Sequence, residues 1–214
     1  MKLKYALLAV FSLTATSQAA TVVTTANQLT PYTVSATDLI NGLAPTMHSG
    51  NFTSEGGTLG VSALTNGTFV DTNAGSFATG DGPAGSGDFV TYFFITTDIS
   101  SVIVYGGWRD NGRDAQNFSL EFTSDGGISF GSPILSGLFN PAIGGGITSA
   151  TRMSVSDNAG NLANGVNGMR VKFLTIENGF SGYSEIDVNA VPEPSSLFLL
   201  GLGSLAAMGI RRRK

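Results

Sequence analysis

The chain has 214 residues, no cysteine, and a formal net charge of −4. Six of its eleven Lys and Arg, and one of its fifteen Asp and Glu, lie outside residues 20–190. That region therefore carries five cationic and fourteen anionic side chains, a net charge of −9. This balance argues against a nucleic-acid or anionic-surface partner, which needs a basic footprint. The lack of cysteine excludes disulfides, thiolate metal sites and a cysteine nucleophile.

Residues 1–19 have the parts of a signal peptide. Lys2 and Lys4 form a basic start, Ala6–Leu13 is apolar, and Ser17–Ala19 supplies small residues at a cleavage site. The apolar run is too short for a permanent transmembrane helix. We expect signal peptidase to cleave after Ala19, with Ala20 as the alternative, and the chain to be exported.

Residues 20–190 are long enough for one domain with its own core, and their pattern is all-β. Short β-rich runs alternate with turn signals, and no segment sustains a helical period. The clearer predicted strands are Asp88–Thr97, Ser101–Tyr105, Phe118–Phe122, Arg152–Ser156, Met169–Ile176 and Tyr183–Val188. The weaker ones are Thr21–Thr25, Thr58–Leu64, Thr68–Asp71 and Ile128–Phe130. We predict an antiparallel β-sandwich or jelly roll.

Turns are marked by Asn-Gly pairs and by one Asp-Gly-Gly, which supply positive φ where a chain reverses. The pairs begin at Asn41, Asn66, Asn111, Asn164, Asn167 and Asn178, and the Asp-Gly-Gly begins at Asp125. Residues 74–87 are rich in Gly, Ser and Ala and predict a flexible loop.

Five segments carry a resemblance to a known superfamily. They are Val102–Asp110, Gly112–Asp114, Phe118–Leu120, Ser124–Gly127 and Gly182–Val188. In order and spacing they resemble the galactose-binding-like, or discoidin-type, β-sandwich. That superfamily has an aromatic and arginine loop after a strand, a Ser-Asp-Gly-Gly hairpin and a last strand with an aromatic-x-Glu-Ile pattern. The fold serves binders of sugar, lipid and protein alike, so the resemblance implies the fold and leaves the ligand open.

The candidate ligand-binding residues are Trp108, Arg109, Asn111 and Arg113, which we predict to share one loop. An indole face can stack on a sugar ring while arginine and asparagine hydrogen-bond its hydroxyls. Alternatively, Trp108 closes the sandwich and Arg113 pairs with Asp114 or Glu185.

The superfamily resemblance also implies a structural calcium ion held by Asn66, Thr68 and Glu185. A plain Asn-Gly turn accounts equally well for Asn66. No catalytic residue is predicted: His48 is the single histidine, and nothing selects a pair of carboxylates.

The C-terminal residues 191–214 have three parts in order. Pro192-Glu193-Pro194 is followed by the uncharged run Ser195–Ile210 and then by Arg211, Arg212, Arg213 and Lys214. This tail resembles the PEP-CTERM sorting signal of Gram-negative bacteria, which implies processing by an exosortase near Pro-Glu-Pro. The run predicts a short transmembrane helix with its basic end in the cytoplasm.

The family of the tail is associated with bacteria that build exopolysaccharide and biofilm matrix. We therefore expect transient anchoring in the inner membrane and a final place at the cell surface or in the extracellular matrix. The sequence favours a non-enzymatic module that binds exopolysaccharide or packs within it. The alternative is a secreted hydrolase acting on matrix glycans.

Overall fold

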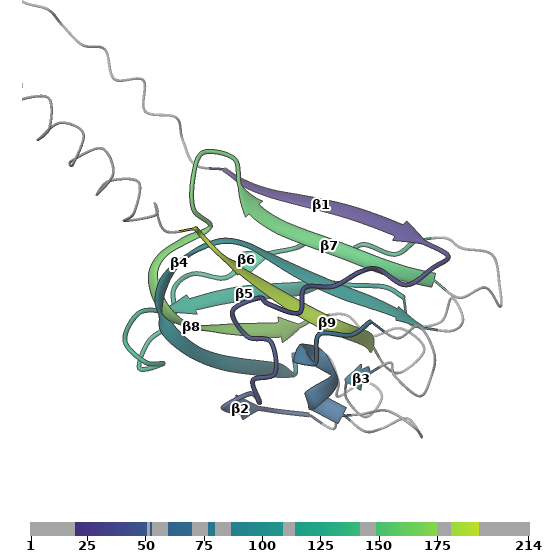
Figure 1. Ribbon diagram of the computed structural model, residues 1–214, viewed down its shortest axis with the longest axis horizontal. Helices are drawn as coiled ribbons and strands as arrows, with labels where there is room; N and C mark the ends of the chain where they lie inside the picture. The colour runs from purple at the N-terminus through teal and green to yellow at the C-terminus, as the bar shows by residue number, and fades with distance from the viewer. Residues whose placement is uncertain are drawn as a thin grey trace, which may run out of the picture.

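The computed structural model describes residues 20–50, 52, 60–69, 77–79, 87–108, 114–141, 149–174 and 181–192. These ranges form nine strands and one short 3-10 helix, η1 (Figure 1). The bounds are β1 Thr21–Gln28, β2 Met47–His48, η1 Gly60–Thr65, β3 Phe77–Thr79, β4 Phe89–Trp108, β5 Phe118–Thr123, β6 Ile134–Leu135, β7 Ser149–Asp157, β8 Ala163–Phe173 and β9 Ser181–Ala190. Every strand pair is antiparallel, which confirms the predicted all-β class. No helix in the described part of the chain is long and apolar enough to cross a membrane.

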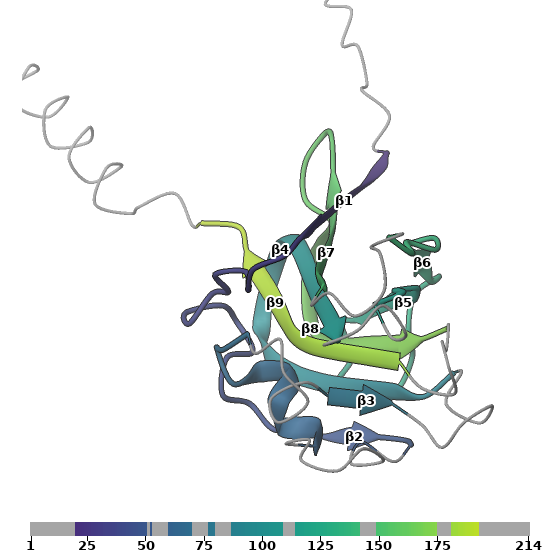
Figure 2. The same ribbon diagram turned by 90° about the vertical axis from the view of Figure 1, so that its right-hand side faces the viewer.

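The long strand β4 belongs to both layers of a sandwich. Residues 89–99 of β4 pair with β8 and β2, whereas residues 101–108 pair with β7 and β9. Register shifts between Phe93 and Ile99 mark the irregular stretch where β4 turns from one layer into the other. The layers are therefore β2-β4-β8-β5-β6 and β1-β7-β4-β9-β3, as Figures 1 and 2 show from two sides.

Alternating side chains fill the space between the two layers. Val90 and Tyr92 from one half of β4, and Val102 and Val104 from the other, are fully buried. The other strands add Phe118, Leu120, Met153, Val155, Met169, Val171, Phe173, Ile186 and Val188. Successive side chains of a strand point to opposite faces, and Ile186 of β9 points into the core. Its neighbours Glu185 and Asp187 therefore lie on the face that points away from the core.

The clearer predicted strands all overlap observed ones, and Asp88–Thr97 and Ser101–Tyr105 join into β4. The prediction for Thr58–Leu64 is wrong over residues 60–64, which form η1 because Ala63 and Leu64 pack into the core from a helical turn. Residues 128–130 are not a strand either, and β6 begins only at Ile134. Within the predicted loop 74–87, residues 77–79 form β3 against β9.

Two of the predicted Asn-Gly turns are confirmed, with positive φ at Gly42 and Gly67. The pairs beginning at Asn164 and Asn167 are instead inside β8, although Gly165 has positive φ. Gly168 there serves close packing, because a Cβ at this position would lie 2.4 Å from a ring carbon of Phe93. The pairs beginning at residues 111 and 178 lie outside the described residues.

Candidate functional site

The outer face of β9 carries two buried carboxylates. Glu185 is 0% exposed and Asp187 is 2% exposed, although both point away from the core. The connection between β1 and β2 covers this face, since the backbone N–H of Leu39 donates to the carbonyl of Val188 and that of Ser35 donates to Asp187 Oδ2. The burial of both acids is thus a consequence of how one long connection crosses the sheet.

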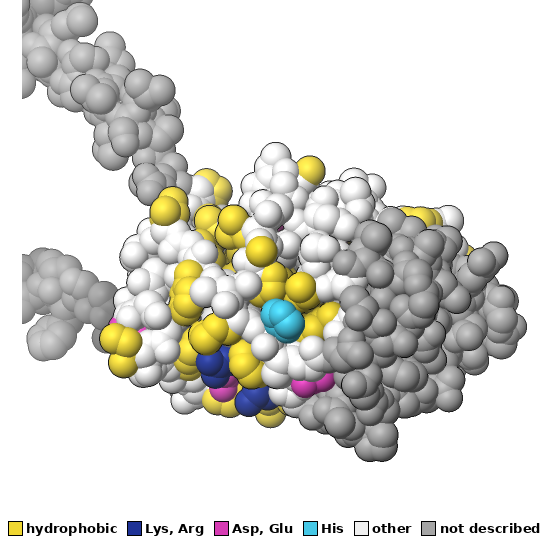
Figure 3. All heavy atoms as spheres, turned by 90° about the horizontal axis from the view of Figure 1, so that it is seen from below, with side chains coloured by type: hydrophobic (Ala, Val, Ile, Leu, Met, Phe, Trp, Pro, Cys, Tyr) yellow, Lys and Arg dark blue, Asp and Glu magenta, His cyan; other side chains and the backbone are white. Residues whose placement is uncertain are grey.

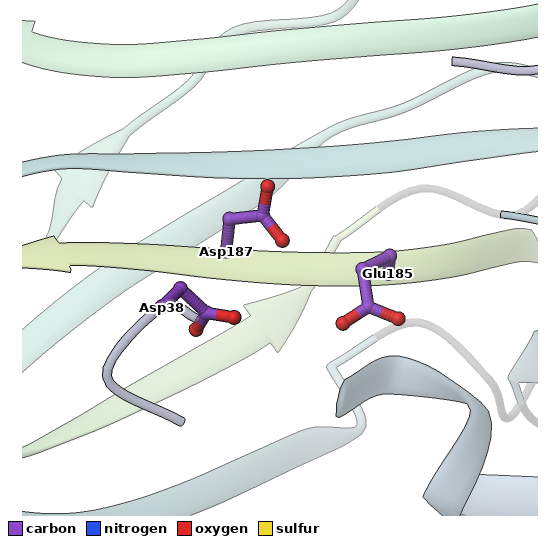
Figure 4. A group of neighbouring side chains, drawn as sticks. All are labelled: Asp38, Glu185 and Asp187. Atoms are coloured by element: carbon purple, nitrogen blue, oxygen red, sulfur yellow. The ribbon is translucent and has the colours of Figure 1, made fainter. Parts of the chain in front are cut away.

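That connection adds a third carboxylate, Asp38. Its Oδ1 accepts hydrogen bonds from the backbone N–H groups of Ile40, at 3.0 Å, and Val188, at 3.1 Å, so the side chain is held against β9. Carboxylate oxygens of Asp38, Glu185 and Asp187 all lie within 4.8 Å of one another. Figure 4 shows these side chains, two from β9 and one from the connection beside it. We call these three residues the acidic cluster.

Each member of the acidic cluster has one oxygen engaged and one oxygen without a partner. Asp187 Oδ2 accepts from the hydroxyl of Tyr105, at 3.1 Å, and Glu185 Oε1 accepts from the backbone N–H of Gly67, at 3.3 Å. The remaining oxygens, Asp38 Oδ2, Glu185 Oε2 and Asp187 Oδ1, are buried and accept no hydrogen bond. Buried polar atoms are ordinarily paired, so three unpaired carboxyl oxygens in one place make the acidic cluster a candidate cation site.

A further unpaired oxygen lies near Gly67, whose N–H donates to Glu185. The side-chain oxygen of Asn41 is also buried without a hydrogen-bond partner, and it lies 2.6 Å from where a Cβ on Gly67 would be. Gly67 has φ +70°, in the left-handed region, and its backbone N–H donates to Glu185 Oε1. Only glycine fits there without strain, and it lets Asn41 approach the backbone that faces Glu185.

The electrostatics of the acidic cluster disfavour the charged forms of its carboxyl groups. Burial raises the pKa of Glu185 to about 8, and the charges of Asp187 and Asp38 add to this, against the backbone amides of Gly67 and Asn66. Burial also raises the pKa of Asp187 and of Asp38. Burial and the nearby Asp187 raise the pKa of Tyr105, so its hydroxyl stays a donor. Among the described residues the one salt bridge, Arg170 to Glu121, lies elsewhere.

The acidic cluster fits a hard divalent cation. Calcium takes carboxylate oxygens, and a site of three carboxylates supplies that donor type. Zinc prefers nitrogen and sulfur ligands, which no member of this group offers.

The structure brings one of the three sequence-predicted metal ligands, Glu185, into this cluster. The other two lie just after η1, where the side-chain oxygen of Asn66 accepts from both the backbone N–H and the hydroxyl of Thr68. Sequence reasoning missed Asp38 and Asp187. Asp187 could have been found, because residues two apart on a strand share a face. Nothing local in the sequence selects Asp38.

The candidate ligand-binding residues lie mostly outside the described ranges. Arg109, Asn111 and Arg113 fall there, and only the backbone of Trp108 is described. The prediction that Trp108 is in a loop is wrong, since it is the last residue of β4 and pairs with Ser149 of β7.

His48 and the buried carboxylates do not form a catalytic constellation. His48 is exposed and pairs through its backbone with Val90. Its ring packs edge-on against that of Phe52, with the ring centroids 5.4 Å apart. Figure 3 shows the histidine among hydrophobic and uncharged side chains. The acidic cluster is too well covered to receive a substrate, which favours a structural role for it.

The end of the chain decides the sorting question. Residues 190–214 match the PEP-CTERM protein-sorting motif. The chain carries a PEP-CTERM sorting motif. The motif begins at Ala190, the last residue of β9, so it follows directly on the folded domain. The motif implies an exported protein that is sorted to the cell surface and processed by an exosortase. Of its residues, Pro192 is described, whereas Glu193, Pro194 and the basic end at residues 211–214 lie outside the described ranges, as does the predicted signal peptide.

No curated protein matches the chain of this PEP-CTERM protein. Its structure is similar to a solved structure titled CpGH89CBM32-5 from Clostridium perfringens in complex with GalNAc-beta-1,3-galactose, with 12% identity, TM-score 0.48, and 67% and 93% of the two chains covered. It is also similar to a Streptococcus pneumoniae fucose binding module, with 12% identity, TM-score 0.46, and 72% and 96% covered. A third similar structure is the family 32 CBM of C. perfringens NanJ in complex with galactose, with 14% identity, TM-score 0.43, and 66% and 92% covered.

Proposed function

We propose that the protein is a non-enzymatic surface or matrix module that associates with exopolysaccharide and whose β-sandwich is stabilised by calcium. The observation that carries this proposal is the sorting motif at residues 190–214, joined directly to the last strand of an all-β domain. Signal peptidase at the start and an exosortase at the end are its processing partners. The tail holds the chain in the inner membrane until it is processed.

The calcium part of the proposal rests on the orphaned oxygens of the acidic cluster. Asp38, Glu185 and Asp187 would hold the ion. A bound ion supplies positive charge that offsets the mutual repulsion of three buried carboxylates. Because Asp38 belongs to the β1–β2 connection and the other two to β9, the ion would fasten that connection to the sheet.

The burial of the acidic cluster also supports a non-catalytic role over the alternative, a hydrolase acting on matrix glycans. A glycosidase needs two carboxylates that flank a bound sugar, roughly 5–10 Å apart. The carboxylates of the acidic cluster face one another beneath the β1–β2 connection. An ion at this position would act on stability rather than on substrate.

The carbohydrate part rests on the sequence around the end of β4, where Trp108 precedes Arg109, Asn111 and Arg113. Loops at the ends of strands are where a rigid sandwich presents contacts to a partner. An aromatic platform with arginine and asparagine beside it suits a neutral or acidic sugar.

The test is a glycan array probed with the exported protein, with and without calcium, followed by sizing of the recovered glycan. Binding with recovery of intact glycan supports the module, and shortened glycan would establish the hydrolase. Trp108 is the only indole, so its fluorescence follows the site directly. A shift of the emission on adding polysaccharide, lost in Trp108→Ala at an unchanged melting temperature, supports the platform. If Trp108→Ala instead costs about 3–5 kcal/mol of stability, the ring belongs to the core.

A further inference from the structure

Both ends of the folded domain leave it on the same side. Strand pairing puts Val22 of β1 opposite Ser156 of β7, Ser156 opposite Ser101 of β4, and Ser101 opposite Asn189 of β9. These four residues form one row across four neighbouring strands. With about 4.8 Å between strands, the start of β1 lies roughly 15 Å from the end of β9. Figure 1 shows the start of β1 and the end of β9 together at one end of the sandwich.

Hydrogen bonds hold the chain in place up to both of these exits. Ala20 donates its backbone N–H to Asn158 Oδ1 at 3.0 Å and accepts from the backbone N–H of Asn158 at 3.2 Å. At the other exit, Val191 donates to the carbonyl of Asp98 at 2.8 Å. The fold therefore fixes the positions of Ala20 and Val191, the residues at which the chain enters and leaves the sandwich. We call this the terminal end of the domain.

The opposite end of the same layer is far from the exits. There Asn27 of β1 is opposite Thr151 of β7, Thr151 is opposite Gly106 of β4, and β4 ends at Trp108. Seven residues of β4 separate Ser101 from Trp108, which is about 23 Å at roughly 3.3 Å per residue.

The link between the domain and the apolar run of the tail is short. Six residue steps separate Val191 from Leu197, so at full extension the link reaches at most about 20 Å. Pro192 and Pro194 stand within it, and proline narrows the conformations open to a chain. A link of this length keeps the terminal end close to whatever surface holds the tail.

We propose that the domain, while its tail is held in the membrane, stands with its terminal end against the lipid and with the Trp108 end of β4 facing outward. This inference rests on the membrane-held tail of the proposed function. A precursor that still carries its signal peptide is then attached to one membrane at both ends without distortion of the sandwich. The partner at the terminal end is the bilayer surface, and the opposite end stays open to a polymer outside the membrane.

The experiment uses two single-cysteine variants of the full chain, Ala159→Cys and Asn27→Cys. Ala159 and Asn27 are exposed and lie at the terminal end and at the opposite end, respectively. The chain has no cysteine of its own, so each variant takes one fluorescent label. The labelled chains are reconstituted into phosphatidylcholine–phosphatidylglycerol vesicles whose headgroups carry a nitroxide quencher, and into matched vesicles without it.

We expect both chains to float with the vesicles, the label at residue 159 to lose most of its fluorescence, and the label at residue 27 to lose little. Equal quenching of the two labels in floating vesicles, or stronger quenching at residue 27, would overturn the proposed orientation and leave membrane attachment intact. If neither chain floats, the tail is not membrane-held, and both the proposed function and this inference are wrong.

Discussion

The acidic cluster predicts that removing one of its carboxyl groups stabilises the metal-free domain. Replacing Glu185 by glutamine should stabilise the metal-free domain and abolish its stabilisation by calcium. Glutamine keeps the size of the side chain and the oxygen that accepts from Gly67. It removes the negative charge that Asp187 and Asp38 oppose.

The size of the effect follows from the pKa of Glu185. This pKa is about 8 in the folded domain against 4.5 for the ordinary side chain, so at pH 7 the group must take up a proton on folding. At about 1.4 kcal/mol for each pH unit between 4.5 and 7, that uptake costs roughly 3 kcal/mol. The amide of glutamine recovers most of this cost, and we expect the metal-free variant to melt roughly 5 °C higher, at about 2–4 °C per kcal/mol.

Calcium should stabilise only the protein with Glu185, and so close most of the gap between it and the glutamine variant. An ion that binds only the folded state adds about 2.7 kcal/mol at a concentration one hundred times its Kd, and Glu185→Gln should lose this gain. The assay is thermal unfolding at pH 7 with EGTA and with calcium. Glu121→Gln is the matched control, since Glu121 pairs with Arg170 on another part of the sheet and should leave the calcium effect unchanged. A variant that is destabilised in EGTA and still responds to calcium would refute the assignment.

Three further predictions can be checked with the same protein. Because the pKa of Glu185 is raised to about 8, its stability contribution in metal-free protein is present below pH 4.5 and lost as pH rises through 8. The melting temperature in EGTA should therefore be higher at pH 6 than at pH 9, and a flat profile would count against the cluster. Gly67→Ala should cost roughly 1–2 kcal/mol, measured by urea unfolding, and should weaken calcium binding in titration calorimetry, because the residue has φ +70° beside Asn41. Neutral replacements across residues 211–214 should weaken membrane retention in fractionated cells, and unchanged retention would contradict the cytoplasmic basic anchor.

The local pattern of the sequence was enough to predict the fold class and the sorting motif. Strand alternation is a local property, so β5, β7 and β9 could be predicted within a few residues, whereas β8 begins six residues before its predicted start at Met169. The sorting motif depends only on the order of three short segments, and it is confirmed at residues 190–214. Residues 60–64 show the limit of such reasoning. Their β-rich composition predicts a strand, but they form a helical turn that packs Ala63 and Leu64 into the core.

Only the tertiary structure decided what the acidic residues do. Glu185 and Asp187 share a face because they are two residues apart on β9, which a sequence can reveal. Asp38 lies 150 residues before Val188 in the sequence, and the β1–β2 connection brings it across the sheet to that residue's backbone and to the other two carboxyl groups. The same connection removes water from the three carboxyl groups and so raises their pKa values. Burial and long-range proximity depend on how the strands are arranged in space, and the periodicity of side chains along one strand does not reveal that arrangement.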